Sequence, residues 1–160
     1  LAFKAAFFPF HIWAPDVYAG ASTPVTAFMA VGTKAGAFAA LIRVFFQASD
    51  GVDILKSNQI LLFFIIATSV FSNLVALRQF HLRRLFAYSG ISHAGFLLIP
   101  FLAGISNTFV AFTFYFVVYG LATLGCFAVF LSIENRRKEN TGADLSIDEI
   151  KGLFFRSPFL

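Results

Sequence analysis

Long apolar blocks run along this sequence, separated by short polar stretches. A helix that crosses a membrane needs about 20 mostly apolar residues, because each residue adds about 1.5 Å to the roughly 30 Å of hydrocarbon that must be crossed. Four blocks reach this length, at residues 24–47, 59–77, 85–104 and 108–133. The pattern therefore predicts an all-α fold, a polytopic bundle of transmembrane helices.

Both ends of the sequence look like parts of further helices. Residues 1–14 are expected to be the closing part of a span whose beginning is missing, and residues 152–160 the opening of another. The sequence starts without Met, so we interpret it as one transmembrane piece of a longer protein. Pro9 cannot donate a hydrogen bond to the Ala5 carbonyl, so the first helix should kink or break just after Lys4. Broken helices at membrane depth persist where protein or water satisfies the free backbone, as in the ion sites of transporters.

Five polar stretches lie between the blocks and are expected to be turns outside the hydrocarbon. They are residues 16–23, 49–58, 78–84, 105–107 and 134–151, of which the last is expected to be a mobile cytoplasmic loop. Alternate turns share one side of the membrane, and one side carries nearly all the basic residues. These are Arg78, Arg83, Arg84, Arg136, Arg137, Lys138 and Lys151, against Lys56 on the other side, with Arg43 nearby. Because basic residues accumulate in cytoplasmic loops, the first side is predicted to be cytoplasmic, or to face the matrix in an organelle.

The composition disfavours several classes of function. Apolar residues make up 59% and charged residues 12% of the chain, whereas soluble domains have about 50% and 25%. The single cysteine, Cys126, rules out a disulfide framework and a multi-thiolate metal site. The three histidines lack metal-binding spacing, and no glycine-rich phosphate loop is present. The net charge of +4 fits basic loops at a membrane surface better than nucleic-acid binding, because no basic stretch is interleaved with aromatic residues.

Three titratable residues are predicted to lie near the middle of the membrane. Lys34 is about 15 Å from either end of its block, too far for its ammonium to reach water easily. A lysine at that depth costs about 2.5–3.5 kcal/mol, which is usually tolerated for a wet path or a partner charge. His93 lies at a similar depth, and Lys4 lies about 18 Å from the turn that starts at Asp16. A structural role stays open for each: Lys34 in a pair with a neighbouring helix, His93 in packing, and Lys4 as an interfacial anchor.

Two helical stripes of smaller polar residues accompany these groups. Ser69, Ser72, Asn73 and Ala76 form one stripe, and Tyr115, Tyr119, Thr123 and Cys126 form the other. Small and hydroxyl residues at such spacings commonly support close packing between membrane helices. We therefore interpret both stripes as helix-contact surfaces, with a functional role as the alternative.

Four segments of the sequence resemble a known membrane family. They are PFHIWAPDVYAGASTPVTAF at 9–28, VGTKAGAFAALIR at 31–43, RRLFAYSGISHAGF at 83–96 and YGLATLGCFAVF at 119–130. In this order and spacing they are similar to the antiporter-like membrane subunits of respiratory NADH:quinone oxidoreductase, complex I. Asp16-Val17-Tyr18 favours subunit N over the sister subunits L and M. Thr33 and Ala19 stand where the family usually has Pro and an acidic residue, and neither change removes an ionisable group from the path described next.

The resemblance implies a fold and a set of functional residues. It implies part of an antiporter-like inverted-repeat fold, from the end of the broken seventh helix to the start of the twelfth. It assigns Lys4 to the lysine of the seventh helix, Lys34 to that of the eighth and His93 to the polar centre of the tenth, which belong to the family's proton path. An acidic residue on the fifth helix and a lysine on the twelfth are implied outside this sequence.

The resemblance also implies the setting of the protein. It implies a proton-translocating subunit with no redox chemistry of its own, driven by quinone reduction elsewhere in the complex. Flavin, iron–sulfur clusters and quinone would then belong to other subunits, and this chain would hold no cofactor. The implied partners are the other membrane-arm subunits, including the antiporter-like sister subunits, in a bacterial inner membrane or the mitochondrial inner membrane. A stand-alone cation/proton antiporter and a purely structural membrane subunit remain alternatives.

Overall fold

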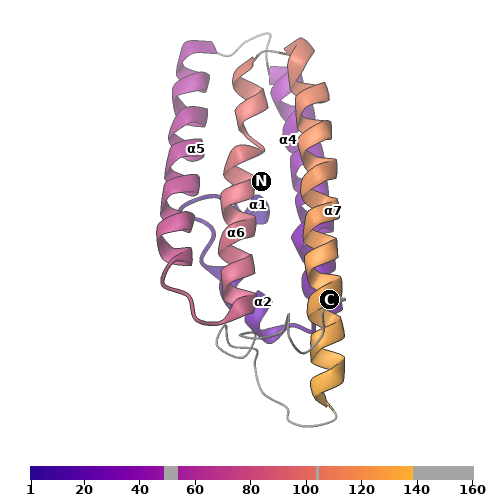
Figure 1. Cartoon of the computed structure of the whole chain (residues 1–160). Helices are drawn as coiled ribbons and strands as arrows, with labels where there is room; N and C mark the ends of the chain where they lie inside the picture. The colour runs from indigo at the N-terminus through magenta and orange to yellow at the C-terminus, as the bar shows by residue number, and fades with distance from the viewer. Residues whose placement is uncertain (49–53, 104, 139–160) are drawn as a thin grey trace.

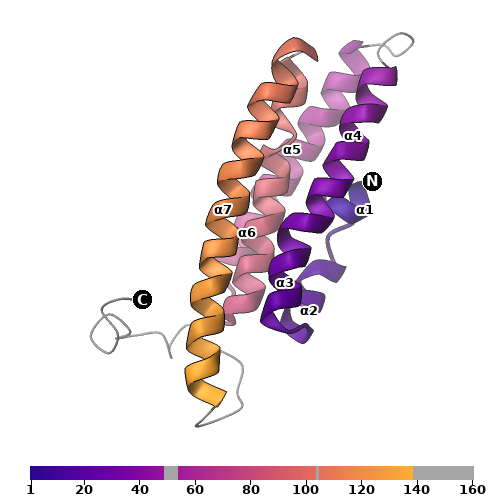
Figure 2. The same ribbon diagram turned by 90° about the vertical axis from the view of Figure 1, so that its right-hand side faces the viewer.

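The computed structural model describes residues 1–48, 54–103 and 105–138, and every regular element in these ranges is a helix. The α-helices are α1 (Ala2–Ala5), α2 (Trp13–Gly20), α3 (Thr23–Phe28), α4 (Lys34–Ala48), α5 (Ile54–Ala76), α6 (Leu82–Phe96) and α7 (Ile105–Lys138). A π-helix, η1 (Met29–Thr33), joins α3 to α4, and a 3-10 helix, η2 (Ile99–Ala103), follows α6. The long helices stand side by side, with α6 between α5 and α7 (Figures 1 and 2).

Four helical segments are long and apolar enough to cross a membrane, judged by length and composition. They are Thr23–Phe45, Asn58–Ala76, Leu82–Leu102 and Thr108–Asn135, which overlap the four apolar blocks of the sequence. Large apolar side chains such as Phe63, Phe114 and Leu121 are exposed on the outside of the bundle. Apolar surface of this extent is typical of contact with lipid or with other membrane proteins. The prediction of an all-α transmembrane bundle is therefore confirmed.

The helices extend into the turns that the polar residues predicted. Residues 16–20 belong to α2, 54–58 to α5, 82–84 to α6, and both 105–107 and 134–138 to α7. Asp16 shows the reason, because it lies in the first turn of α2, where the helix dipole stabilises a carboxylate. A polar residue at such a position starts a helix as readily as it marks a turn. The remainder of the expected loop at 134–151 and the expected helix start at 152–160 lie outside the described residues.

The chain is broken between α1 and α2, just after Lys4, as the sequence predicts. The cause differs from the expected one. Ala6 takes the left-handed conformation, with φ 60°, and the N–H groups of Ala6 and Phe7 donate to carbonyls of the preceding turn at 3.1 and 3.0 Å. This Schellman ending closes the helix before Pro9 is reached. α1 lies about half-way along the length of the bundle in both views (Figures 1 and 2).

Two side-chain hydrogen bonds hold the broken segment in place. The hydroxyl of Thr68, on α5, accepts from the Phe8 N–H at 3.1 Å, and the Trp13 indole N–H donates to the Phe3 carbonyl at 3.0 Å. Thr68 is fully buried. Since no helix ladder satisfies the Phe8 N–H, the position of this segment depends on α5.

Replacing Thr68 by valine should loosen the broken segment. Valine has nearly the same shape but no hydroxyl, so the partly buried Phe8 N–H loses its acceptor, at a cost of about 1 kcal/mol. We expect a lower midpoint of thermal unfolding for the intact protein in detergent. Thr113→Val, at an exposed position of α7, is the matched control and should leave the midpoint unchanged. Equal midpoints for the two variants would show that the Thr68 hydroxyl does not support the segment.

The block at 85–104 is not one continuous helix. α6 ends at Phe96 and η2 begins at Ile99, because Pro100 has no N–H to donate to the Phe96 carbonyl. The Pro100 carbonyl accepts a hydrogen bond from the Thr108 hydroxyl at 2.8 Å. This bond ties the end of the α6 span to α7.

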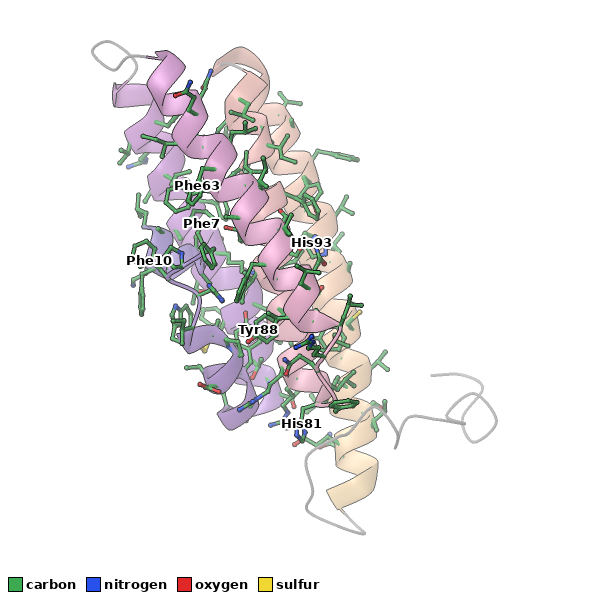
Figure 3. The ribbon with its side chains drawn as sticks, turned by 90° about the vertical axis from the view of Figure 1, so that its left-hand side faces the viewer. Phe7, Phe10, Phe63, His81, Tyr88 and His93 are labelled. Carbon is green, nitrogen blue, oxygen red and sulfur yellow. The ribbon has the colours of Figure 1, made fainter. Side chains whose placement is uncertain are left out.

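An aromatic core fixes α4 between the broken segment and α7. Phe38 of α4 is fully buried, and its ring centre lies 5.7 Å from that of Phe7 and 5.4 Å from that of Phe112. Phe7 is the labelled ring inside the bundle in Figure 3. Because Lys34 lies one turn before Phe38, this core also sets the position of the lysine.

Candidate functional site

Lys34 is the first residue of α4, and 4% of its surface is exposed. Its ammonium donates hydrogen bonds to the Gly90 carbonyl of α6 and, at 3.1 Å, to the Tyr119 hydroxyl of α7. The ammonium nitrogen lies 5.2 Å from the centre of the Tyr119 ring, within the range of a cation–π interaction. Among the described residues Lys34 forms no ion pair. Neutral oxygens and an aromatic ring of this chain therefore surround the charge.

The π-helix η1 directly precedes Lys34. A π-turn adds one residue to the α-helical ladder and is found frequently at functional sites. The Thr33 hydroxyl donates to the Met29 carbonyl at 2.6 Å, and the Tyr119 hydroxyl donates to the Ala30 carbonyl at 3.3 Å. Tyr119 thus contacts both the π-helix and the lysine, so the local geometry of η1 and the position of the ammonium are coupled.

His93 comes to the same group of residues from α6. Figure 3 shows its side chain directed toward α7. Its Nδ1 lies 2.8 Å from the Tyr115 hydroxyl, and its ring centre lies 5.0 Å from that of Tyr119. The structure therefore brings Lys34 and His93 together, with Tyr119 between them.

A hollow of about 220 Å³ lies between α6 and α7 beside these residues. His93, Tyr115 and Tyr119 line it, together with Ser89 and Thr123. A water molecule takes up about 30 Å³ in the liquid and needs two to four polar partners. The hollow therefore has room for several waters. Its lining is mostly apolar, so these five side chains supply the polar partners for water.

The two tyrosines are site residues that sequence reasoning missed. The interpretation of their stripe as a helix-contact surface is incomplete, because the hydroxyls of Tyr115 and Tyr119 bond to the titratable groups. The available signal was that a buried tyrosine hydroxyl needs a partner, and few polar groups exist in these spans. The stripe on α5 does act as a contact surface: Asn73 donates to the Ser92 hydroxyl of α6 at 2.9 Å.

Lys4 lies apart from Lys34 and His93. Its side chain is exposed and lines a second hollow of about 500 Å³, together with Gly32, Thr33 and other small residues of η1 and α4. These residues face α1, whereas Lys34 faces α6 and α7. The structure thus brings two of the three predicted residues, Lys34 and His93, together. The third, Lys4, lies on the opposite side of the segment formed by η1 and α4.

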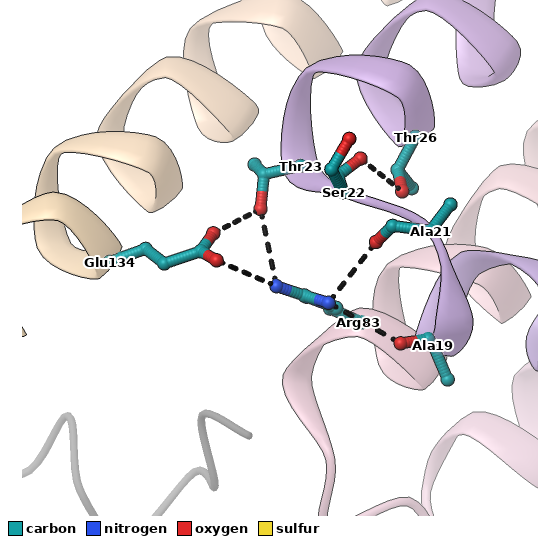
Figure 4. Close-up of polar contacts among 7 residues, drawn as sticks. All are labelled: Ala19, Ala21, Ser22, Thr23, Thr26, Arg83 and Glu134. Atoms are coloured by element: carbon teal, nitrogen blue, oxygen red, sulfur yellow. Dashed lines mark hydrogen bonds and ion pairs between the residues drawn. The ribbon is translucent and has the colours of Figure 1, made fainter. Parts of the chain in front are cut away.

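A largely buried ion pair joins α6 to α7, and Figure 4 shows its polar contacts. Arg83 of α6 pairs with Glu134 of α7 at 3.2 Å and donates to the carbonyls of Ala19 and Ala21 at 3.3 and 3.2 Å. The Thr23 hydroxyl donates to the second carboxylate oxygen of Glu134. We call these five residues the Arg83 cluster. The sequence placed both charges in water-facing loops, which is wrong, because the helices continue and only 16% and 21% of the two side chains are exposed.

The described residues contain no group of three His, Cys, Asp or Glu side chains that could hold a metal ion. Lys34, His93 and the two tyrosines bring hydrogen-bonding and titratable side chains together at one place in the bundle.

The chain is similar along its whole length to known membrane proteins. Residues 1–160 match the family described as NADH:quinone oxidoreductase/Mrp antiporter, TM. The chain is 52% identical over 160 residues to NADH-quinone oxidoreductase subunit N of Protochlamydia amoebophila (strain UWE25), with 100% of this chain and 32% of that protein covered. It is 45% identical over 162 residues to subunit N 1 of Herpetosiphon aurantiacus, with the same coverage of each. The chain thus spans about one third of the length of these relatives.

Two solved structures share the arrangement of helices. A chain of respiratory complex I from Thermus thermophilus with bound aureothin has a TM-score of 0.77 and 37% identity, covering 98% of this chain and 32% of that one. A chain of the membrane-bound sulfane sulfur reductase, an archaeal respiratory membrane complex, has a TM-score of 0.73 and 27% identity, covering 79% and 26%. The resemblance noted in the sequence is confirmed by these matches. Since the family matches over the full length and the helices suit a bilayer, this chain belongs to the NADH:quinone oxidoreductase/Mrp antiporter membrane family.

Proposed function

We propose that the protein is a proton-translocating, antiporter-like membrane subunit, of the subunit N type, of an NADH:quinone oxidoreductase. The observation that carries the proposal is the buried Lys34 ammonium, which is bonded to Tyr119 beside His93 and a hollow with room for water. A charge at such a depth is expensive, and membrane proteins keep such groups mainly for ion and proton pathways. The names of the relatives support the same function.

Lys34 and His93 are the residues that bind and release protons in this proposal. The Tyr119 hydroxyl accepts from the ammonium and donates its own proton to the Ala30 carbonyl. If this O–H rotates toward the hollow, the hydroxyl can pass a proton between Lys34 and water there. His93 can take a proton from that water on the ring nitrogen that does not contact Tyr115. Two charges 4 Å apart interact by about 1 kcal/mol in water and about 4 kcal/mol near a protein surface. A charge that approaches or leaves can therefore change the affinity of the lysine for its proton.

Lys4 is proposed as a second proton-binding residue, in its own hollow on the other side of η1 and α4. A proton that passes between Lys4 and Lys34 has to cross this segment, where the regular hydrogen bonding of the helix is interrupted by the π-turn. Quinone reduction elsewhere in the complex is proposed to drive the transfer. Iron–sulfur clusters are typically held by four cysteines, and these 160 residues contain one, so they do not supply such a ligand set by themselves. The redox groups are proposed to lie in other subunits.

A stand-alone cation/proton antiporter is the second candidate, because the family description also covers Mrp antiporters. Affinity purification of the full-length protein from its native membrane separates the two. Recovery with flavin- and iron-containing subunits supports the oxidoreductase, and recovery without them supports the antiporter.

The variant Gly90→Ala tests the role of Lys34 without replacing the lysine. A methyl group at position 90 would lie 2.9 Å from the Lys34 ammonium nitrogen and 3.4 Å from the Tyr119 hydroxyl oxygen. Because 2.9 Å is too short for a carbon contact, the lysine must move away from the Gly90 carbonyl. We expect the proton uptake per NADH oxidised to fall, by up to the share that passes through this subunit, in vesicles that contain the intact complex.

The matched control for this experiment is Gly125→Ala on α7, where no atom lies within 4 Å of the added methyl group. This variant should keep the wild-type ratio of protons to NADH. An unchanged ratio in Gly90→Ala as well would count against transport through Lys34.

A further inference from the structure

An apolar layer separates the Lys34 group from the Arg83 cluster on each of three neighbouring elements. Along each element a residue of the Lys34 group comes first, then apolar residues, then a residue of the Arg83 cluster. The order is Gly90, Phe86 and Arg83 on α6; Tyr119, Phe127 with Phe130, and Glu134 on α7; and Lys34, Ala30 with Ala27, and Thr23 from α4 back to α3. Because the three elements share this order, their apolar residues form one layer across the bundle.

Three phenylalanines fill this layer and pack on one another. The ring centre of Phe86 lies 5.4 Å from that of Phe127 and 5.8 Å from that of Phe130, and the last two are 6.4 Å apart. Phe127 and Phe130 are 2% and 3% exposed. Ala30, Ala87 and Tyr18 pack in the same cluster, so apart from the Tyr18 hydroxyl the side chains of this cluster bring no polar group into the layer. We call Phe86, Phe127 and Phe130 the aromatic layer.

Both faces of the aromatic layer meet polar groups. Phe86 lines the hollow beside His93 and Tyr119, so one face meets the site. On the other face, Arg83 comes one turn before Phe86 and Glu134 one turn after Phe130, which is about 4.5 Å along α6 and about 6 Å along α7. The Arg83 Nε is buried and has no hydrogen-bond partner among the described residues. The layer is therefore thin and stands directly between two polar regions.

We propose that Phe86, Phe127 and Phe130 form a dry barrier that stops water and protons from passing between the Arg83 cluster and the hollow beside Lys34. The inference rests on the proposed function, because such a barrier matters only if protons reach Lys34. Protons move along hydrogen-bonded chains, and the three rings offer no link in such a chain. Hydrophobic constrictions in channels stop conduction in this way, by excluding water. A rotation of one ring would open a connection filled with water. The layer therefore controls whether water and protons reach the hollow beside Lys34 from the Arg83 cluster.

Cys126 provides a natural probe for this barrier, because it lines the hollow, is exposed, and comes directly before Phe127 on α7. The experiment uses vesicles that contain the intact complex and a small, membrane-impermeant methanethiosulfonate cation. Labelling of Cys126 is followed by mass spectrometry of its peptide, with the reagent added to either side of the membrane. Wild type should be labelled slowly from the Arg83 side. We expect labelling about tenfold faster or more in Phe130→Ser and in Phe86→Ser, because a serine hydroxyl admits water to the constriction.

Two controls separate a barrier from ordinary core packing. Phe130→Leu keeps the layer apolar and should stay slow, and Phe114→Ser, at a 73% exposed position of α7, should have no effect. Fast labelling of wild type from the Arg83 side, or no acceleration in either serine variant of the layer, would overturn the proposal. Equal acceleration from both sides of the membrane would also overturn it, because this indicates general loosening. Labelling does not require proton transport, so the barrier and the proposed function can fail separately.

Discussion

A complex that carries Lys34→Met is expected to assemble and yet to lose the proton transport that passes through this subunit. Methionine is similar in length to lysine and fills the same space between α4, α6 and α7, so the fold should tolerate the loss of the hydrogen bonds to the Gly90 carbonyl and the Tyr119 hydroxyl. A thioether cannot bind a proton at any physiological pH, so the loss of transport through this position should be complete. The measurement is proton uptake per NADH oxidised, in vesicles with a verified amount of assembled complex.

The variant Lys34→Arg decides between a proton carrier and a structural cation. Arginine keeps a positive charge and hydrogen-bond donors for the Gly90 carbonyl and the Tyr119 hydroxyl, but it does not release its proton in proteins. If Lys34 carries protons, Lys34→Arg should fail like Lys34→Met. If Lys34 only joins helices, the arginine variant should keep the wild-type ratio of protons to NADH.

Arg43→Met is the matched control for the Lys34 variants. Arg43 lies on the same helix, α4, and is exposed, so its replacement removes one positive charge without touching the site. The ratio of protons to NADH should stay at the wild-type value. Wild-type transport by Lys34→Met would refute the proposed role of the lysine, and an equal loss in Arg43→Met would show that the effect comes from net charge.

Replacing Arg83 by methionine is expected to cause the largest loss of stability. Arg83 bonds to the Ala19 and Ala21 carbonyls and to Glu134, so it joins α2, α6 and α7 through a single side chain. Its removal leaves a mostly buried carboxylate without its partner charge. Breaking a fully buried pair costs about 3–5 kcal/mol, and partial exposure to solvent reduces this to about 2–4 kcal/mol here. The midpoint of thermal unfolding of the intact complex should fall, and less assembled complex should be recovered.

The neighbouring residue Arg84 offers the matched control. Arg84 pairs with Asp16 at 3.0 Å, but the two side chains are 44% and 72% exposed. Exposed pairs contribute about 0–1 kcal/mol, so Arg84→Met should shift the midpoint little. Equal shifts for the two arginine variants would contradict the assignment of Arg83 as a clamp between helices.

The length and apolar character of the blocks were enough to predict the bundle, because lipid leaves a chain few alternatives to helices. The ends of the helices could not be predicted as well. Asp16 and Glu134 are polar and were expected in turns, but one lies in the first turn of α2 and the other pairs with Arg83. Their surroundings come from residues that are far away in the sequence. The ending of α1 at Ala6 likewise depends on backbone geometry that no residue type signals.

The candidate site could be predicted only in part, again because its contacts join residues that are far apart in the sequence. Lys34 and His93 stand out because each is a titratable group in an apolar block, and the structure brings them together. Tyr115 and Tyr119 were interpreted as part of a helix-contact stripe, because their bonds to Lys34 and His93 depend on which helices meet. The π-helix before Lys34 could not be predicted, since its sequence Met-Ala-Val-Gly-Thr has no distinctive feature.

The central claim is that Lys34 changes its protonation state while the complex works. Nitrogen-15 NMR of the complex labelled at the lysine side-chain nitrogen distinguishes an ammonium from a neutral amine, and subtraction of a Lys34→Met sample assigns the signal. We predict that part of the Lys34 signal converts from one form to the other when NADH oxidation begins. A Lys34 signal that stays in the ammonium form at rest and during turnover would contradict the account and leave the residue as a fixed contact between α4, α6 and α7.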